Sequence, residues 1–445
     1  MRLKLLQSAT ATAATALALG ATTGAYAIDD TAMQNIAGRV TAVEPQLISW
    51  RRDIHQHPEL SGQETRTSAL VAAHLKKLGY EVKTGVGGTG VVGILKGGKP
   101  GKVVALRADM DALPVKEMVD LPFASKAKGT HMGKQVDVAH ACGHDGHTAI
   151  LMAVAEVLAG MKDQLPGTVK LIFQPAEEGL SSEQAVPGAH IGAAAMIDAG
   201  VMDNPKVDAV FGLHLSSGLP AGVIGYRSGP VMASADAFTI KVAGKQTHGA
   251  IPWGGIDPIV SSAQIVLGLQ TIISRQTDLT KEPAVVTVGT IHGGNRENIV
   301  PDSVEMMGTV RTFDDGMRDD ILRRMNLTAT SIAQSSGARA DMNVSPVHYS
   351  TTVNNDALTQ KMLPTLGKAA NGRVVMVPKV SASEDFSEYQ KKAPGLFFFV
   401  GSTAPGIDPK TAPVNHSPLY QVDESALPVG ARALSALAVD YLSSN

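Results

Sequence analysis

Four short apolar runs along the chain predict buried strands, and each run leads into acidic or histidine residues. The runs span residues 102–107, 168–173, 207–213 and 395–400. In that order they lead into Asp109, the pair Glu177 and Glu178, His214, and a loop that carries His416. Predicted helices, such as 148–159, separate most of the runs, so we expect an α/β sheet. Ligands bind beyond the carboxyl ends of the strands in such sheets, which predicts a site built from four regions.

The segment 232–352 has its own pattern of predicted elements. We expect a strand at 237–242, a helix from Asp257–Pro258, strands at 284–291 and 303–313, a helix at 318–335 and a strand at 340–347. This β-α-β-β-α-β order predicts a ferredoxin-like α+β domain with two helices on one face of its sheet. It would be inserted into a two-part, mixed-sheet α/β domain with helices on both faces, formed by residues 28–231 and 353–445.

Length and charge agree with this organisation and exclude some partners. A chain of 445 residues is long for one hydrophobic core and suggests two domains. The formal net charge of −2 argues against a nucleic-acid partner, because phosphate binding requires a concentrated basic surface. After the N-terminus, no apolar stretch is long enough to span a bilayer, so no membrane contact is expected in the mature protein.

The first 27 residues have the pattern of a cleavable signal peptide. Arg2 and Lys4 precede an Ala-rich apolar run at 13–19, and Ala25-Tyr26-Ala27 is typical of a cleavage site. We therefore expect a periplasmic or secreted protein that begins near Ile28. A structured N-terminal helix is the alternative, but the run is short and ends in small residues.

The segment 140–147, His-Ala-Cys-Gly-His-Asp-Gly-His, holds the densest cluster of reactive side chains. Its cysteine, Cys142, is the single cysteine of the chain, which is unusual for an exported protein unless the thiol is buried or binds a metal. Thiolate, imidazole and carboxylate groups suit zinc, manganese or a related divalent ion. The alternative is a polar loop with a buried thiol. His140 and His147 are expected to pack or to orient ligands rather than to bind metal.

Two adjacent carboxylates, Glu177 and Glu178, follow the second strand. Because neighbouring side chains point in different directions, one can bind metal while the other takes a proton from an attacking water. A metal lowers the pKa of that water from about 15.7 towards about 7. Taken alone, the pair could be a solvated acidic turn, and His214 and His416 could be ordinary core or loop histidines. Asp109 and Asp111 are candidate ligands or partners that orient a ligand histidine.

Five motifs resemble, in order, those of the M20 metallopeptidases, and more narrowly the amidohydrolase branch, subfamily D, with its hippurate hydrolases and N-acyl-amino-acid amidohydrolases. They are the segments 107–114 (RADMDALP), 140–147 (HACGHDGH), 174–179 (QPAEEG), 383–386 (SEDF) and 416–418 (HSP). The resemblance spans nearly the whole mature chain. It implies a site with two divalent metal ions, which would be zinc, manganese, cobalt or nickel.

The resemblance also implies a role for each matched residue. Cys142 would bridge the two metals, and the coordination would be completed by His144, Glu178, His214 and His416. Glu177 would be the general base and then the acid that protonates the leaving amine. Asp109 would orient a metal ligand without binding the metal itself.

The inserted segment would be the family's lid, which commonly also forms a homodimer. Within it, His248 would stabilise the oxyanion, in its own subunit or across the dimer, although it could also be a simple turn histidine. Asn298 would help to hold the carboxylate or amide of the substrate. Arg311 is a weaker candidate for substrate binding, since an arginine on a strand often faces solvent.

The reaction implied is hydrolysis of the amide bond in N-acyl or N-aroyl amino acids by a metal-activated water. A metallo-carboxypeptidase or dipeptidase acting on short peptides would use the same residues and is the alternative. A binding protein without activity would be expected to lack the base or a ligand, and neither is missing. A serine hydrolase is disfavoured because no Gly-x-Ser-x-Gly elbow follows a strand.

Overall fold

The computed structural model describes residues 28–180 and 188–444. The predicted signal peptide, residues 1–27, lies outside this described part. Within the described ranges, none of the helices combines the length and the hydrophobicity that crossing a membrane requires.

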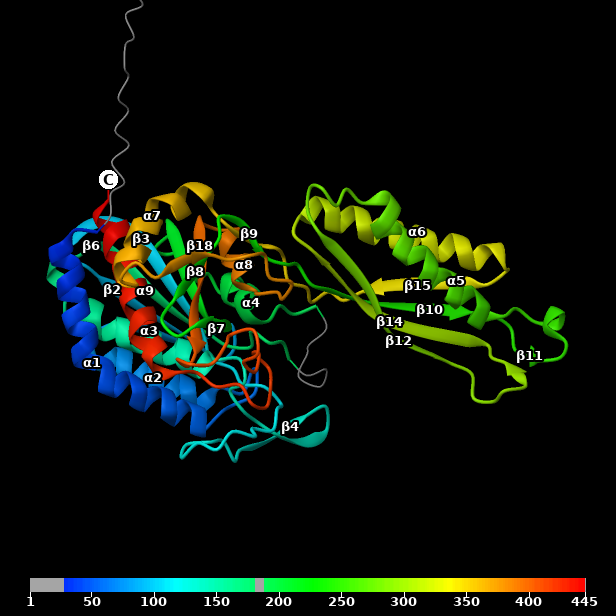
Figure 1. Cartoon of the computed structure of the whole chain (residues 1–445), viewed down its shortest axis with the longest axis horizontal. Helices are drawn as coiled ribbons and strands as arrows, with labels where there is room; N and C mark the ends of the chain where they lie inside the picture. Colours follow the sequence, from blue (N-terminus) through cyan, green and yellow to red (C-terminus); the bar gives the residue numbers. More distant parts are fainter. Residues whose placement is uncertain (1–27, 181–187, 445) are drawn as a thin grey trace, which may run out of the picture.

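A large mixed sheet forms the centre of the first domain, as predicted (Figure 1). Over the described residues it has eight strands in the spatial order β1-β2-β6-β3-β7-β18-β8-β17. These are β1 (Glu81–Val86), β2 (Gly90–Lys96), β3 (Lys99–Asp109), β6 (Pro166–Gln174), β7 (Ala209–Pro220), β8 (Ile224–Tyr226), β17 (Val374–Met376) and β18 (Gly395–Thr403). The central strands β6, β3, β7 and β18 are parallel. Strands β1 and β2 pair antiparallel with their neighbours, and β8 is antiparallel to β18 but parallel to β17.

Helices cover both faces of this sheet, which explains why its central strands are buried at most positions. In β18, Leu396 and Phe398 pack into one core and Phe397 and Phe399 into the other. The larger core is shared with α1 (Asp30–Gln56), α2 (Thr65–Lys77), α3 (His144–Ala159), α7 (Asp356–Ala369) and α9 (Leu427–Ser443). The smaller core is shared with α4 (Gly192–Asp198) and α8 (Phe386–Gln390).

The second domain is the predicted ferredoxin-like unit. Its antiparallel sheet has the order β12-β14-β10-β15. The strands are β10 (Asp236–Ala243), β12 (Ala284–Gly293), β14 (Ser303–Thr312) and β15 (Arg339–Val344), and α5 (Pro258–Thr271) and α6 (Asp315–Ser335) lie together on one face (Figure 1). Asp257 caps α5 by accepting hydrogen bonds from the backbone N–H groups of Ile259 and Val260.

The chain leaves the large domain and returns to it at one place. Strand β9 (Gly229–Met232) leads into the lid, β16 (Thr352–Asn354) leads out, and the two pair antiparallel. The domain boundaries that we propose, 232 and 352, fall on these strands. At the opposite end of the lid lie the short strands β11 (Thr247–His248) and β13 (Ile299–Val300) (Figure 1). A hairpin of β4 (Lys128–His131) and β5 (Lys134–Asp137) projects from the large domain.

Two element boundaries differ from the prediction. Helix α3 begins at His144 and not at 148, because Gly143 adopts a left-handed conformation with φ of 107° and starts the helix earlier. The prediction that His214 follows its strand was wrong, since β7 continues to Pro220. The pairing of His214 with Phe399 and of Leu215 with Val400 extends this strand past its polar histidine.

Candidate metal centre

The predicted metal ligands converge at the carboxyl ends of the central strands. Cys142 precedes α3, Glu178 follows β6, His214 lies in β7, and His416 lies in the loop after β18. The Sγ atom of Cys142 is 3.3 Å from Nε2 of His214 and 3.2 Å from Nε2 of His416. The same His416 atom is 2.9 Å from Oε1 of Glu178. Residues up to 274 positions apart are thereby brought into contact.

Hydrogen bonds orient two of the histidines so that Nε2 presents a lone pair to the cluster. Nδ1 of His144 donates to the carbonyl oxygen of Asp111 at 2.8 Å. Nδ1 of His214 donates to the carbonyl oxygen of Leu215 at 2.7 Å. In the described part of the chain, the buried Nε2 of His144 has no hydrogen-bond partner. A buried imidazole nitrogen without a partner is costly unless it binds something, and a metal ion is the partner that this tautomer suits.

The donor atoms form two groups that share the cysteine. Within each group the ligand atoms lie within 4.8 Å of one another; one group is Cys142, His144 and His214, and the other is Cys142, Glu178 and His416. Hydrogen bonds with Cys142 and Glu178 raise the pKa of His416 to about 10. The cluster therefore favours positive charge, and its thiol, carboxylate and imidazole groups are of the types that would hold divalent metal ions.

The backbone has positive φ angles at or beside three residues of this cluster. Gly143, beside Cys142, has φ of 107°, and an added Cβ there would lie 3.2 Å from the Tyr420 hydroxyl. Ala176, just before the Glu pair, has φ of 51°, and His416 itself has φ of 72°. Left-handed conformations of residues other than glycine occur mainly where the surrounding structure fixes them, often at functional sites.

Asp109 and His147 lie next to the cluster and are hydrogen-bonded to each other. Oδ1 of Asp109 accepts a hydrogen bond from Nδ1 of His147 at 2.6 Å and lies 3.8 Å from Nε2 of His144. Nε2 of His147 accepts from the backbone N–H of Leu215 at 2.8 Å, so both of its nitrogens are occupied. This geometry gives His147 no free atom for a metal and places Asp109 where it can orient neighbouring ligands.

Glu177 forms a possible donor group with His144 and Glu178, and it also belongs to a group of acids beside the cluster. Its carboxylate lies within 4.8 Å of those of Glu384 and Asp385. Burial, together with the negative charges of Glu384 and Glu178, raises the pKa of Glu177 well above the ordinary range. A carboxylate with a raised pKa is suited to accept a proton and to release it later.

Three residues not selected from the sequence support the acidic groups, and two of them, Glu64 and Tyr349, hold the loop of Glu177 and Glu178. Glu64 accepts a hydrogen bond from the backbone N–H of Ala176 at 2.9 Å, and Tyr349 donates its hydroxyl hydrogen to the carbonyl oxygen of Glu177 at 2.6 Å. Arg107, buried in β3, donates to Glu384 at 2.8 Å. Arg107 and Glu384 lie inside motifs that carried the family resemblance, which was a usable signal. Tyr349 stands alone in the segment after the last lid strand, and nothing in the sequence marks it.

Asp111 fixes the orientation of the acidic pair. Its carboxylate accepts the backbone N–H of Glu177 at 3.1 Å and that of Glu178 at 3.0 Å, and it accepts the hydroxyl of Ser61 at 2.6 Å. Of the two roles that the sequence left open for Asp111, the geometry favours that of an orienting partner.

A cavity of about 750 Å³ opens over the cluster. Its apolar walls include Leu219, Met232, Val377, Val380 and Phe399. Arg311 also lines it, half-buried, with Nη1 donating to Oγ of Ser383 at 3.0 Å. Arg311 therefore does not simply face solvent, and it brings a positive charge to the space that Glu177 and Glu178 line.

His248 and Asn298 lie apart from the cluster in the described chain. Both are exposed, and they sit at the tip of the lid, where β11 pairs with β13 far from the large domain (Figure 1). Nδ1 of His248 accepts from the backbone N–H of Ala250 at 3.0 Å, and the carbonyl oxygen of Asn298 accepts from Gly249 at 2.8 Å. In this conformation neither residue lines the cavity over the cluster.

The fold and the metal cluster define a two-domain hydrolase, and comparison with known proteins identifies its family. The family model for peptidase family M20/M25/M40 matches residues 105–440. The chain belongs to this family, and the predicted resemblance is confirmed. It is a metal-dependent hydrolase that acts on amide bonds.

Individual relatives cover almost the whole chain. Thermostable carboxypeptidase 1 of Saccharolobus solfataricus is 44% identical over 412 residues, which are 92% of this chain and 98% of that protein. N-acetylcysteine deacetylase of Bacillus subtilis is 38% identical, over 90% of this chain and 98% of that protein. The solved structure of the Bacillus subtilis YXEP protein, described as a dinuclear metal binding peptidase from the M20 family, superposes with a TM-score of 0.74 at 35% identity, over 91% of this chain and all of that one.

Proposed function

We propose that this enzyme hydrolyses the amide bond of N-acyl or N-aroyl amino acids and releases the free amino acid. The observation that carries the proposal is the position of Arg311 in the same cavity as Glu177 and the metal cluster. A half-buried guanidinium is suited to bind a carboxylate through two parallel hydrogen bonds. The apolar walls of the cavity offer a surface for an acyl or aroyl group.

Two divalent ions per chain would be held by Cys142, His144 and His214 on one side and by Cys142, Glu178 and His416 on the other. When bound, such ions polarise a carbonyl and lower the pKa of an attacking water. Zinc, manganese, cobalt and nickel all accept this set of thiolate, imidazole and carboxylate ligands.

Glu177 would accept the proton from the attacking water and pass it to the departing amine. Its raised pKa supports this role, because the proton must remain on the carboxylate until the amine leaves. Asp111 and Tyr349 hold the Glu177 backbone from opposite sides and so fix where its carboxylate points.

A metallo-carboxypeptidase is the second candidate, and the 44% identity to thermostable carboxypeptidase 1 favours it. Both candidates cleave an amide bond next to an amino acid with a free carboxylate. They differ only in whether the acyl side is a simple acid or a peptide. Arg311 serves the same purpose in both.

The substrate proposal predicts that a free carboxylate is needed for tight binding. The Arg311→Met variant should raise KM for N-benzoyl and N-acetyl amino acids by about 10- to 100-fold, the value of a charge-assisted hydrogen bond. For the corresponding carboxamides, KM should change little. The measurement is steady-state hydrolysis by enzyme reconstituted with each metal in turn, with unblocked dipeptides and N-blocked peptides assayed in parallel.

Arg339→Met on the exposed lid strand β15 is the matched control and should behave as wild type. Equal KM increases for acids and carboxamides would remove Arg311 from carboxylate binding. Faster cleavage of N-blocked peptides than of N-acyl amino acids would favour the carboxypeptidase. If no metal supports hydrolysis of either class, the proposal fails.

His248 is proposed to stabilise the oxyanion in a partner subunit of a lid-mediated homodimer. If this is right, His248→Ala and Glu177→Gln should each be nearly inactive, yet their co-expressed mixture should recover about a quarter of wild-type activity. Half of the dimers would be mixed, and each mixed dimer would contain one complete site. A mixture no more active than its two components would show that His248 does not act across subunits.

A further inference from the structure

Ile28, the first residue of the described chain, is buried in the large domain and hydrogen-bonded to it. Its side chain is only 4% exposed and belongs to the main apolar core. Its backbone N–H donates to Oγ1 of Thr365 on α7 at 3.2 Å, and its carbonyl oxygen accepts from Nζ of Lys368 at 2.6 Å. Helix α1 begins directly afterwards, capped by Asp29.

A buried carboxylate on α9 lies close to the same nitrogen. Asp440 is 5% exposed and accepts a hydrogen bond from the Thr365 hydroxyl, whose oxygen accepts from the backbone N–H of Ile28. Among residues 28–180 and 188–444, no lysine, arginine or histidine nitrogen lies within the 4.0 Å of a salt bridge to it. A buried carboxylate normally has a cationic partner, because desolvation of an unpaired charge is costly.

One hydroxyl group joins the backbone N–H of Ile28 to the Asp440 carboxylate. A peptide N–H has one hydrogen to donate, and the Thr365 hydroxyl that accepts it donates in turn to Asp440. An α-ammonium group at this position would have three hydrogens and a positive charge, and at neutral pH it would be mostly protonated.

We propose that hydrolysis of the Ala27–Ile28 peptide bond during export creates an α-ammonium group on Ile28, which Asp440 then binds as a buried ion pair. Water adds across the bond, so that the leader leaves with a carboxylate and Ile28 keeps the amine, which takes up a proton. The inference rests on the proposed signal peptide and is independent of the proposed substrate. The new N-terminus locks α1 onto α7 and α9.

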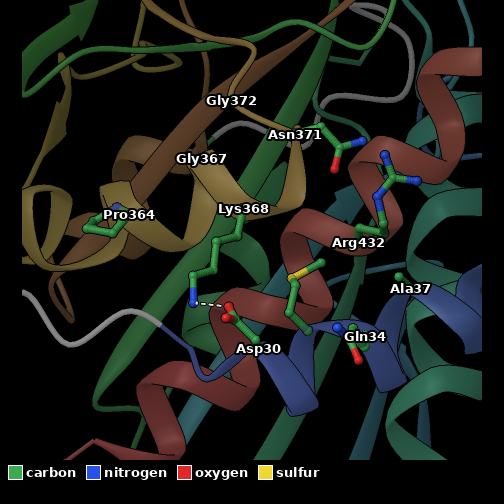
Figure 2. Close-up of a pocket in the computed structure, with 10 residues that line it drawn as sticks. Asp30, Gln34, Ala37, Pro364, Gly367, Lys368, Asn371, Gly372 and Arg432 are labelled. Atoms are coloured by element: carbon green, nitrogen blue, oxygen red, sulfur yellow. Dashed lines mark hydrogen bonds and ion pairs between the residues drawn. The ribbon is translucent and has the colours of Figure 1, made fainter.

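The charged residues near Ile28 are compatible with this ion pair. Figure 2 shows the start of α1 against α7, where the ammonium of Lys368 meets the carboxylate of Asp30 at 2.7 Å. The same view shows Arg432 of α9 beside Asn371, on the other side of a cavity of about 680 Å³. Lys368 is hydrogen-bonded to Asp30 and to the carbonyl oxygen of Ile28, and it forms no salt bridge with Asp440 within the described residues.

The first test is chemical. Protein exported with its own leader should have the intact mass and the N-terminal sequence of a chain that starts at Ile28. An amine-acylating reagent at pH 7 should modify the Ile28 amine at least about tenfold more slowly in wild type than in Asp440→Asn, because the ion pair keeps the amine protonated. A mature chain starting elsewhere, or equal labelling rates, would overturn the proposal.

The second test separates the ion pair from a general role of Asp440 in packing. In the chain that starts at Ile28, Asp440→Asn should lower Tm by about 3 °C or more, the loss expected when a buried pair is broken. In a chain with Gly-Ser-Met before Ile28, which has no α-ammonium there, the same substitution should cost much less. Equal losses in the two chains would contradict the proposal.

Asp30→Asn is the matched control for the second test. It removes the same charge two residues away, but Asp30 is exposed, so Tm should change little in either chain. If Asp440→Asn fails to fold in the chain that starts at Ile28, the wild-type chains with and without Gly-Ser-Met before Ile28 can still be compared. The chain without Gly-Ser-Met should have the higher Tm, and an equal or lower Tm would count against the ion pair.

Discussion

Glu177→Gln is expected to lower kcat by about 10²- to 10⁴-fold while both metal ions remain bound, because the change removes proton transfer but keeps the shape of the side chain. The loop should not move, since its anchors at Asp111 and Tyr349 contact the Glu177 backbone and not its carboxylate. The measurement is kcat for an N-acyl amino acid together with metal content by elemental analysis.

The neighbouring Glu178→Gln variant is the natural control. Glu178 belongs to the donor group with Cys142 and His416, so its loss should reduce metal content as well as kcat. Opposite results, with metal lost from Glu177→Gln and retained in Glu178→Gln, would exchange the proposed roles of the two acids. Near-normal turnover in Glu177→Gln would remove it as the base.

Replacement of Cys142 should have the second-largest effect, and the outcome should depend on the charge of the new side chain. Cys142→Ala takes the shared anion from both donor groups, so affinity for both metals should fall by more than about 100-fold and activity should fall with it. Cys142→Asp keeps a bridging anion and should retain two ions and part of the activity. Metal titration of the stripped variants, followed by assay, measures both quantities.

Circular dichroism of both variants provides the check on folding. Cys142 is 6% exposed and lies just before α3, so a misfolded variant would lose helical signal. A folded Cys142→Ala variant that still binds two ions tightly would exclude the thiolate as a bridge. Equal metal loss in the Asp and Ala variants would show that sulfur itself, and not negative charge, is required.

Sequence alone predicted the parts of the site in which local pattern and chemistry coincide. The four apolar runs became neighbouring central strands, and the acid and histidine residues beyond them met because parallel strands end at one edge of a sheet. The short strands β8 and β17 at one side of the sheet were not predicted, since three residues carry too little periodicity.

Other features depend on contacts that no local pattern encodes. Tyr349 acts through one hydroxyl that reaches a backbone carbonyl 172 positions away. The extent of β7 depends on its pairing with β18, which overrides the polar character of His214. The distance of His248 from the metal cluster follows from the orientation of the whole lid (Figure 1).

The pairing of β9 with β16 has a consequence for the order in which the chain folds. The lid separates two parts of the large domain that must form one sheet, since β18 follows the lid and β7 precedes it. Once the lid has folded and its two ends have paired, it joins Met232 to Thr352 as a short turn would. Because the entropy of loop closure grows with the logarithm of loop length, this shortening removes about 1 kcal/mol from the barrier to adding β18. A chain that completes its inserted domain early would therefore assemble its catalytic sheet faster.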